Sequence, residues 1–238
     1  MNPVSIILTI FVIIFIYYIF NYFLTNPYTL QTLINGQTAT TISKDKLKNG
    51  GLDSNFSYSI WFYVNDWNYN IDKNKVIFGR MDTGTGTGTI TDVSGKNPSP
   101  LVVLTPTENN LNVYLQCQGI TEPNMCSINN IPIQKWVNLV VSVYNRTMDL
   151  YLDGKLVRTC LLPGVPQISN TDVQITPAGG FNGWTSKFQY FPSSLNPQDA
   201  WNIYTQGYGG NIFSNLIKSY QVQFSILENG VTYSSVTI

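Results

Sequence analysis

The chain contains no histidine and few charged side chains: 13 basic and 13 acidic residues among 238. Without histidine, a Ser-His-Asp triad, a His-ligated zinc site and a haem held by an axial histidine are all excluded. The formal net charge of zero gives no bulk electrostatic attraction for nucleic acid, which usually requires a basic surface. We therefore expect no histidine-based chemistry and no nucleic-acid partner.

The N-terminus carries a long apolar run without any charge, since the first charged side chain is Lys44. Residues 4–24 read VSIILTIFVIIFIYYIFNYFL. A helix of this length spans about 30 Å, the thickness of the hydrocarbon core of a bilayer. The segment lacks the basic start and the small-residue cleavage site of a signal peptide. We therefore predict a membrane protein with a single transmembrane anchor over residues 1–26. The anchor residues are Val4, Ile7, Phe11, Phe15, Tyr18, Tyr22 and Leu24.

The cysteines leave two interpretations open. Cys117, Cys126 and Cys160 are an odd number, which is not the pattern of a disulfide framework. Cys117 and Cys126 flank residues 118–125 and are placed to form a disulfide across a hairpin. Alternatively, all three are reduced and partly buried thiols, which fits an intracellular location. Lys44, together with the lysines at 46 and 48, also favours a cytoplasmic domain by the positive-inside rule.

Two further segments follow the anchor: a polar linker over residues 27–51 and a β-rich domain over residues 52–238. In the domain, short runs of β-branched and aromatic residues alternate with polar ones and are interrupted by Gly, Asn and Pro, which is typical of an all-β fold. So many short strands in one body favour a sandwich or jelly roll. Strands are predicted at residues 56–64, 75–79, 101–104, 111–116, 136–144, 148–152, 155–161 and 183–190.

One short helix is expected near the end of the domain. Asn196 is a suitable N-cap, Pro197 suits the first helical position, and Gly207 is placed to end the helix. Beyond it, a C-terminal extension over residues 208–238 contains two more predicted strands, at 220–227 and 231–238.

Four stretches carry a resemblance to a known family: FSYSIWFYVNDW, VIFGR, KWVNLVVSVYNRTMDLYLDGKLV and GGFNGWTSKFQYFPSSLNPQDAWNIYTQG. In this order they resemble the laminin-G-like branch of the concanavalin A-like lectin/glucanase superfamily, with the strongest match over residues 52–207. The resemblance implies an antiparallel jelly roll of two sheets, here placed behind a membrane helix.

Some members of that superfamily hydrolyse glycosides, and some bind calcium. Hydrolysis requires two carboxylates on one face, whereas Glu108, Glu122 and Glu228 are far apart in the sequence. We therefore predict no enzymatic activity and no cofactor. Calcium ligands would have to come from loop aspartates, and no dense cluster of EF-hand type is present, so no metal site is predicted. The loop aspartates are Asp66, Asp72, Asp82 and Asp92.

Glycan binding is the chemistry for which the loops offer candidates. A sugar site commonly combines an aromatic ring with amide or carboxylate groups that bind hydroxyls. Trp67 with Asn68 and Tyr69 in one loop, or Asn182 with Trp184 in another, have these properties. The alternative is that these aromatic residues serve packing or an interface.

Two functions follow from these observations. The first is a non-enzymatic structural protein at a membrane, with the lipid bilayer and neighbouring proteins as partners. By resemblance to membrane-associated virion proteins of large DNA viruses, it would be a minor capsid protein linking a protein shell to an internal membrane. The second is a membrane-anchored lectin.

Overall fold

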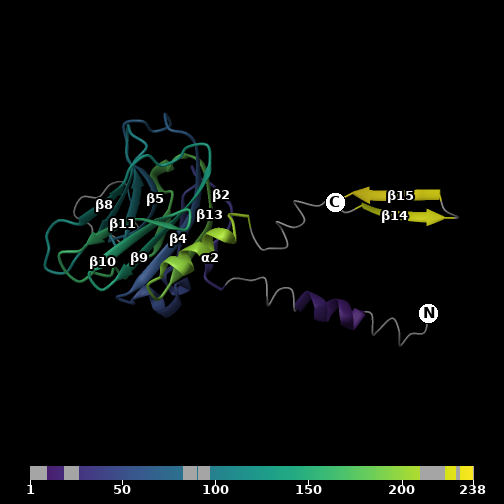
Figure 1. The fold of residues 1–238 in the computed structure, drawn as a ribbon, viewed down its shortest axis with the longest axis horizontal. Helices are drawn as coiled ribbons and strands as arrows, with labels where there is room; N and C mark the ends of the chain where they lie inside the picture. Colours follow the sequence, from purple (N-terminus) through teal and green to yellow (C-terminus); the bar gives the residue numbers. More distant parts are fainter. Residues whose placement is uncertain are drawn as a thin grey trace. The chain divides into compact units, whose positions relative to one another are not determined.

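The computed structural model describes residues 10–18, 27–82, 90 and 97–209, together with the backbone of residues 223–228 and 231–237. The chain divides into two units (Figure 1). One unit, residues 28–208, contains the two large sheets, and the other consists of the terminal segments 1–27 and 209–238.

Seven strands of the larger unit form the first antiparallel sheet, in the order β1-β13-β4-β9-β10-β11, with β2 also paired to β13. Residues Lys155–Leu161 form β11, which is therefore a free edge of this sheet. The other strands are β1 (Thr29–Gln31), β2 (Ile34–Asn35), β4 (Phe56–Asp66), β9 (Trp136–Tyr144), β10 (Thr147–Leu152) and β13 (Asn182–Phe191).

Six strands form the second antiparallel sheet, in the order β3-β12-β5-β6-β7-β8. Residues Asn124–Ile128 form β8, the edge strand at one end of this order. The other strands are β3 (Thr40–Ile42), β5 (Lys75–Arg80), β6 (Leu101–Leu104), β7 (Leu111–Leu115) and β12 (Val173–Ile175). The predicted all-β sandwich of two antiparallel sheets is thus confirmed.

The hydrophobic core lies between the two sheets. Along β4, Ile60, Phe62 and Val64 are fully buried in it, because alternate side chains of a strand point to the same face. From the second sheet, Phe78 and Val102 belong to the same cluster. Burying a side chain of this size stabilises the fold by about 1.5–3 kcal/mol, so this layer holds the two sheets together.

The segment for which the sequence predicts a linker, residues 27–51, contributes strands to both sheets. It contains β1, β2 and β3, and it ends in two short 3-10 helices, η1 (Lys44–Lys46) and η2 (Lys48–Gly51). The buried guanidinium of Arg80 donates hydrogen bonds to the carbonyl oxygens of Gly50 and Gly51 and ties this end to the sandwich. Strands of two or three residues are too short to show an alternating pattern, which explains why the sequence does not reveal them.

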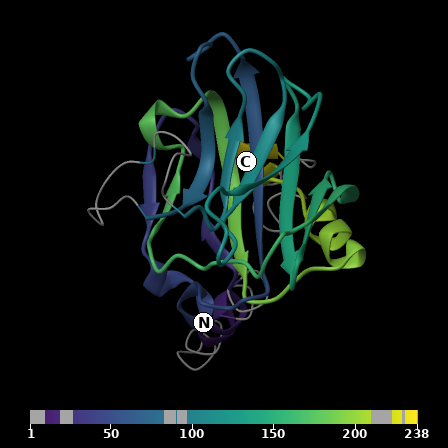
Figure 2. The ribbon, with the colours of Figure 1, turned by 90° about the vertical axis from the view of Figure 1, so that its left-hand side faces the viewer.

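The predicted helix is present as α2 (Pro197–Thr205). Asn196 is its N-cap, and the side chains of Asn196 and Asp199 form a capping box that satisfies exposed N–H groups of the first turn. Ala200 packs with Val140 and Tyr151 on the face of the first sheet that points away from the core. Figure 2 shows α2 on the outside of the sandwich.

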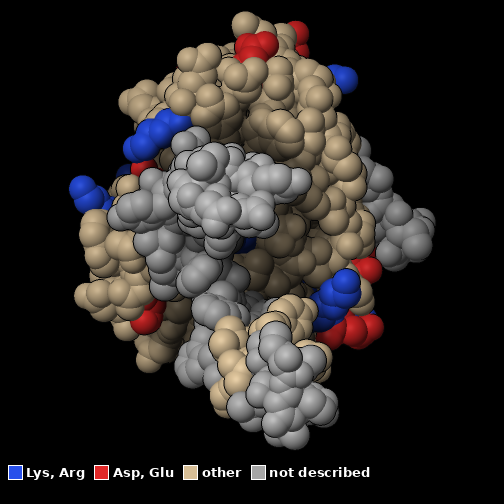
Figure 3. All heavy atoms as spheres, turned by 90° about the vertical axis from the view of Figure 1, so that its right-hand side faces the viewer, with Lys and Arg blue, Asp and Glu red and all other residues tan. Residues whose placement is uncertain are grey.

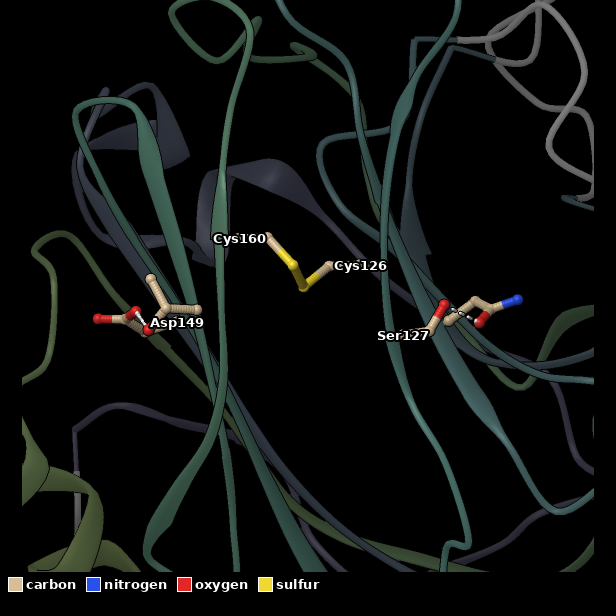
Figure 4. The surroundings of a disulfide bond; sticks show 6 residues. Cys126, Ser127, Asp149 and Cys160 are labelled. Carbon is tan, nitrogen blue, oxygen red and sulfur yellow. Dashed lines mark hydrogen bonds between the residues drawn. A yellow bond between two sulfur atoms is a disulfide. The ribbon is translucent and has the colours of Figure 1, made fainter.

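Both interpretations of the cysteines are wrong, the disulfide Cys117–Cys126 and the three reduced thiols: Cys126 is bonded to Cys160, and Cys117 is free and buried. In the β7–β8 hairpin Val113 lies opposite Cys126, while Cys117 lies beyond the end of β7 and bridges to Pro166. Cys126 belongs to β8 and Cys160 to β11, so the bond joins edge strands of the two sheets (Figure 4). The hydrogen bonds Ser127–Asn112 and Thr159–Asp149 flank it.

In the smaller unit, residues 10–18 are helical, with exposed apolar side chains that include Phe11, Phe15 and Tyr18 of the predicted anchor. Among the described residues, no helix combines the length and the apolar character that crossing a bilayer requires. The remaining residues predicted for the anchor lie outside the described residues: Val4, Ile7, Tyr22 and Leu24. The C-terminal extension forms an antiparallel hairpin of β14 (Gln223–Glu228) and β15 (Val231–Thr237).

Candidate functional site

A pocket of about 660 Å³ lies at one end of the sandwich, where three loops meet. The first loop follows β4, the second precedes β7 and the third follows β8. Because Leu111 at the start of β7 pairs with Ile128 at the end of β8, the second and third loops are neighbours. The lining residues are Trp67, Asn68, Ile71, Thr107, Glu108, Asn109, Asn110, Asn129 and Asn130.

Five of the nine lining residues are asparagines, and they fall into two groups. Asn109 and Asn110 hold the loops in place: Asn109 donates to the carbonyl oxygen of Ile131 at 3.1 Å, and Asn110 donates to Glu108 Oε2 at 2.6 Å. The other three, Asn68, Asn129 and Asn130, are exposed, and within the described ranges no side-chain hydrogen bond engages their amides. These three amides are available to a ligand.

Trp67 is half-buried between this pocket and a buried lysine. Its ring packs against the main core on one side, and the ammonium nitrogen of Lys75 lies 5.1 Å from the ring centroid. Lys75 is fully buried and donates to the carbonyl oxygen of Pro106 at 3.0 Å. Burial lowers the pKa of Lys75, while the carboxylates of Asp66 and Asp72 act in the opposite direction. The ammonium group of Lys75 therefore contacts the Trp67 ring and the Pro106 carbonyl, and it does not line the pocket.

The other glycan-binding candidates lie elsewhere. Tyr69 turns toward Gly179, where a Cβ atom would lie 3.3 Å from its hydroxyl, and it does not line the pocket. Asn182 and Trp184 belong to β13, and Trp184 is 45% exposed on the first sheet. The structure thus brings Trp67 and Asn68 together in one site and leaves the other three candidates outside it.

The candidate calcium ligands do not gather. Across the described part of the chain, no three His, Cys, Asp or Glu side chains are close enough to hold a metal ion. Asp66 instead accepts a hydrogen bond from the backbone N–H of Asn68 at 3.0 Å, which shapes the loop. Asp72 and Asp82 are exposed, and Asp92 lies outside the described residues.

Most of the asparagines in the pocket are absent from the sequence prediction because they come from different loops. The signal lies in two short motifs, Glu108-Asn109-Asn110 and Asn129-Asn130, at the outer ends of one hairpin. The sequence pattern does not predict β8. Without the pairing of β7 with β8, nothing in the sequence indicates that the two motifs are neighbours. Once the hairpin is recognised, an asparagine pair at each of its ends would have indicated the polar lining of the pocket.

Charge is sparse around the fold as well as in the sequence. On the face shown in Figure 3, the basic and acidic side chains stand singly or in small groups, and no basic patch forms there. Within the described residues one ion pair is present, between Lys135 and Asp153 at 3.0 Å. The lining of the pocket likewise consists mainly of amides and one indole, with Glu108 as its one charged side chain.

Two antiparallel sheets stacked face to face, with a pocket built from loops at one end, define a lectin-like sandwich. The chain belongs to the concanavalin A-like lectin/glucanases superfamily, whose model matches residues 35–203. The match confirms the resemblance seen in the sequence, and it begins at β2, inside the predicted linker. No curated protein matches the chain.

Solved structures with a similar fold include binding domains of botulinum neurotoxins. The serotype D binding domain has a TM-score of 0.52 and 14% identity, over 78% of this chain and 55% of that one. The binding domain of botulinum neurotoxin DC in complex with rat synaptotagmin II has a TM-score of 0.52 and 15% identity, over 76% of this chain and 46% of that one. This chain thus spans about half of each toxin domain, and the likeness concerns the fold alone.

Proposed function

We propose that this protein is a glycan-binding module that holds its ligand in the pocket between the three loops. The observation that carries the proposal is one indole combined with five asparagines among nine lining residues. Amides both donate and accept hydrogen bonds, as sugar hydroxyls do, and an indole offers an apolar surface to a sugar ring. Asn68 and Asn129 can bind hydroxyls without giving up a protein hydrogen bond.

The ligand we infer is a neutral glycan. Glu108 lines the pocket, and its carboxylate repels sialic acid or sulfate groups. None of the lining residues is a cation, and Lys75, which lies next to Trp67, is buried and already bound to Pro106. An anionic sugar therefore meets a negative charge in the pocket without a compensating positive one.

We also propose that the module is not an enzyme. Glycoside hydrolysis uses two carboxyl groups placed across the scissile bond. Glu108 is the one carboxylate among the residues that line the pocket, and it already accepts a hydrogen bond from Asn110. A sugar held by amides beside a single carboxylate is bound without being cleaved.

We place the module at a membrane, tethered by the apolar residues 4–24. Disulfides persist in oxidising compartments, so the bond between Cys126 and Cys160 favours the non-cytoplasmic side. The lysines that favour the cytoplasmic side lie in η1 and η2, which belong to the sandwich unit. The role as a minor capsid protein between shell and membrane stays a prediction from sequence resemblance.

A glycan array probed with the full-length protein in detergent tests the proposal. We expect neutral glycans to bind and their sialylated counterparts to bind less. The double variant Asn68→Ala/Asn129→Ala removes two exposed amides, and two hydrogen bonds of about 1 kcal/mol each correspond to a loss of at least about tenfold in affinity.

The matched control is Asn170→Ala, which removes an exposed asparagine that does not line the pocket. It should bind like the unaltered protein. An array without specific binding, or equal affinity in the double variant and the control, would show that the pocket is not a glycan site.

A further inference from the structure

Outside the pocket, the first sheet carries a row of tyrosines and tryptophans on the face that points away from the core. Trp184 on β13 lies opposite Tyr63 on β4, and Tyr63 lies opposite Trp136 on β9. The neighbours of Tyr63 in sequence, Phe62 and Val64, are fully buried in the core. Since successive side chains of a strand alternate between faces, these three aromatic rings share the outer face.

The row continues from β9 toward α2 through ring contacts. Trp136 stacks on Tyr208 with the ring centroids 4.3 Å apart, and Tyr208 lies 6.0 Å from Trp61. Trp61 stacks on Tyr204 at 5.6 Å, and Tyr204 lies 5.6 Å from Trp201 on α2. We call these seven residues the aromatic row: Trp184, Tyr63, Trp136, Tyr208, Trp61, Tyr204 and Trp201.

The aromatic row is open to its surroundings at three places. Trp184, Trp201 and Tyr208 are 45%, 43% and 40% exposed, and only Trp61 is buried. The row contains no phenylalanine, whereas the core contains Phe62 and Phe78 among others. Tyrosine and tryptophan each combine an apolar ring with a polar group, and they are enriched where proteins meet the headgroup layer of a bilayer.

We propose that the aromatic row docks onto the headgroup layer of the membrane to which the chain is tethered; this inference rests on the tether proposed above. Residues 25–27 alone separate the apolar run from the sandwich unit. Even fully extended, three residues span only about 10 Å. The tether leads into β1, which pairs with Phe188 and Gln189 of β13, four and five residues along that strand from Trp184.

A short tether makes weak docking effective. Because the sandwich cannot leave the surface, its local concentration at the bilayer is high, and a few partly inserted rings suffice to orient it. A lysine at the border of the row fits this orientation: Lys155 is exposed and follows Gly154, which packs against Trp201. Cationic side chains are attracted to the negative surface of bilayers that contain anionic lipids.

Tryptophan fluorescence offers a direct test, because all five tryptophans lie in the sandwich and none in the apolar run. The full-length protein is reconstituted into phosphatidylcholine vesicles with or without dibrominated acyl chains, which quench nearby tryptophans. We expect quenching, stronger with bromine close to the headgroups than deep in the chains. The variant Trp184→Phe/Trp201→Phe should lose at least half of it.

Trp67→Phe is the matched control, because Trp67 lines the pocket and is not part of the aromatic row. It should retain the quenching, and circular dichroism checks that all variants are folded.

Vesicle flotation reports the tether separately: protein that fails to float disproves the tether, and the inference with it. Protein that floats without quenching, or with quenching unchanged in the double variant, overturns the docking alone. A fluorescence change with soluble oligosaccharides that persists in Trp67→Phe but is lost in Trp184→Phe/Trp201→Phe would assign the row to glycan and overturn the docking.

Discussion

The three cysteines occupy chemically different positions. Cys126 and Cys160 close a loop with a sequence separation of 34, and such a loop stabilises a fold by about 3–4 kcal/mol through the entropy of the unfolded chain. Burial raises the pKa of the Cys117 thiol, which also has no exposed surface. Cys117 is therefore unreactive in the folded protein.

We expect no cysteine of the native protein to react with a thiol reagent, and one cysteine to react in urea without reductant. The variant Cys126→Ser/Cys160→Ser should lose about 3 kcal/mol of unfolding free energy in urea titrations, while Cys117→Ser keeps the disulfide and loses less. Three reactive cysteines in non-reducing urea would contradict this assignment.

Individual residues of the site were only partly predictable. Trp67 and Asn68 follow a strand directly, so their place in a loop at the end of the sandwich could be predicted from the local sequence. The disulfide partner of Cys126 and the pocket neighbours of Asn129 depend on which strands pair. Strand pairing in turn depends on burial across the whole sandwich. Local sequence does not contain this information.

At the scale of elements, one glycine decides how β13 joins β4. Gly183 has φ of 156°, and a Cβ atom there would lie 1.8 Å from the carbonyl oxygen of Tyr63. The register shifts beside it, between Asn182 and Gly183, which sets Trp184 opposite Tyr63. Absence of a side chain at this position therefore allows the two central strands to approach.

Gly183→Ala should destabilise the protein by at least about 3 kcal/mol, because a clash with backbone adds to the conformational strain. Gly119→Ala is the control: its φ of 72° is also positive, but nothing lies within 4 Å of the added Cβ, so we expect a cost of roughly 1–2 kcal/mol from backbone strain alone. Thermal unfolding measures both. Equal losses would mean that β13 relaxes away from β4.

The longest strands were predictable, whereas the strands of two or three residues were not. The pattern over residues 56–64 alternates for long enough to identify β4, whereas β2 has two residues and β3 three. These short strands exist because β13 and β12 offer free edges to them. Their formation depends on the finished sheets, so the N-terminal border of the sandwich could not be read from propensity.

At the scale of the whole molecule, the chain combines a charge-free N-terminal run with a sandwich whose surface carries the two features to which we assign recognition. The pocket is lined by amides, and the aromatic row consists of rings with polar edges. The scarcity of charge fits both, since neither amides nor rings depend on ion pairs. Residues 28–208 form their own compact unit and bury their own core, so the sandwich does not depend on the apolar run for its fold.

Deleting residues 1–26 should therefore give a soluble protein with the circular dichroism of an all-β fold and an unchanged thermal midpoint. The full-length protein should stay in the membrane fraction after washing with alkaline carbonate if residues 4–24 anchor it as we propose, because a segment that spans the hydrocarbon core is removed only by detergent. The truncated protein should be washed off completely, since the proposed docking of the aromatic row involves the headgroup layer and not the hydrocarbon core. If the truncated protein stays in the membrane fraction after the carbonate wash, the apolar run is not the anchor, and the sandwich itself binds the membrane.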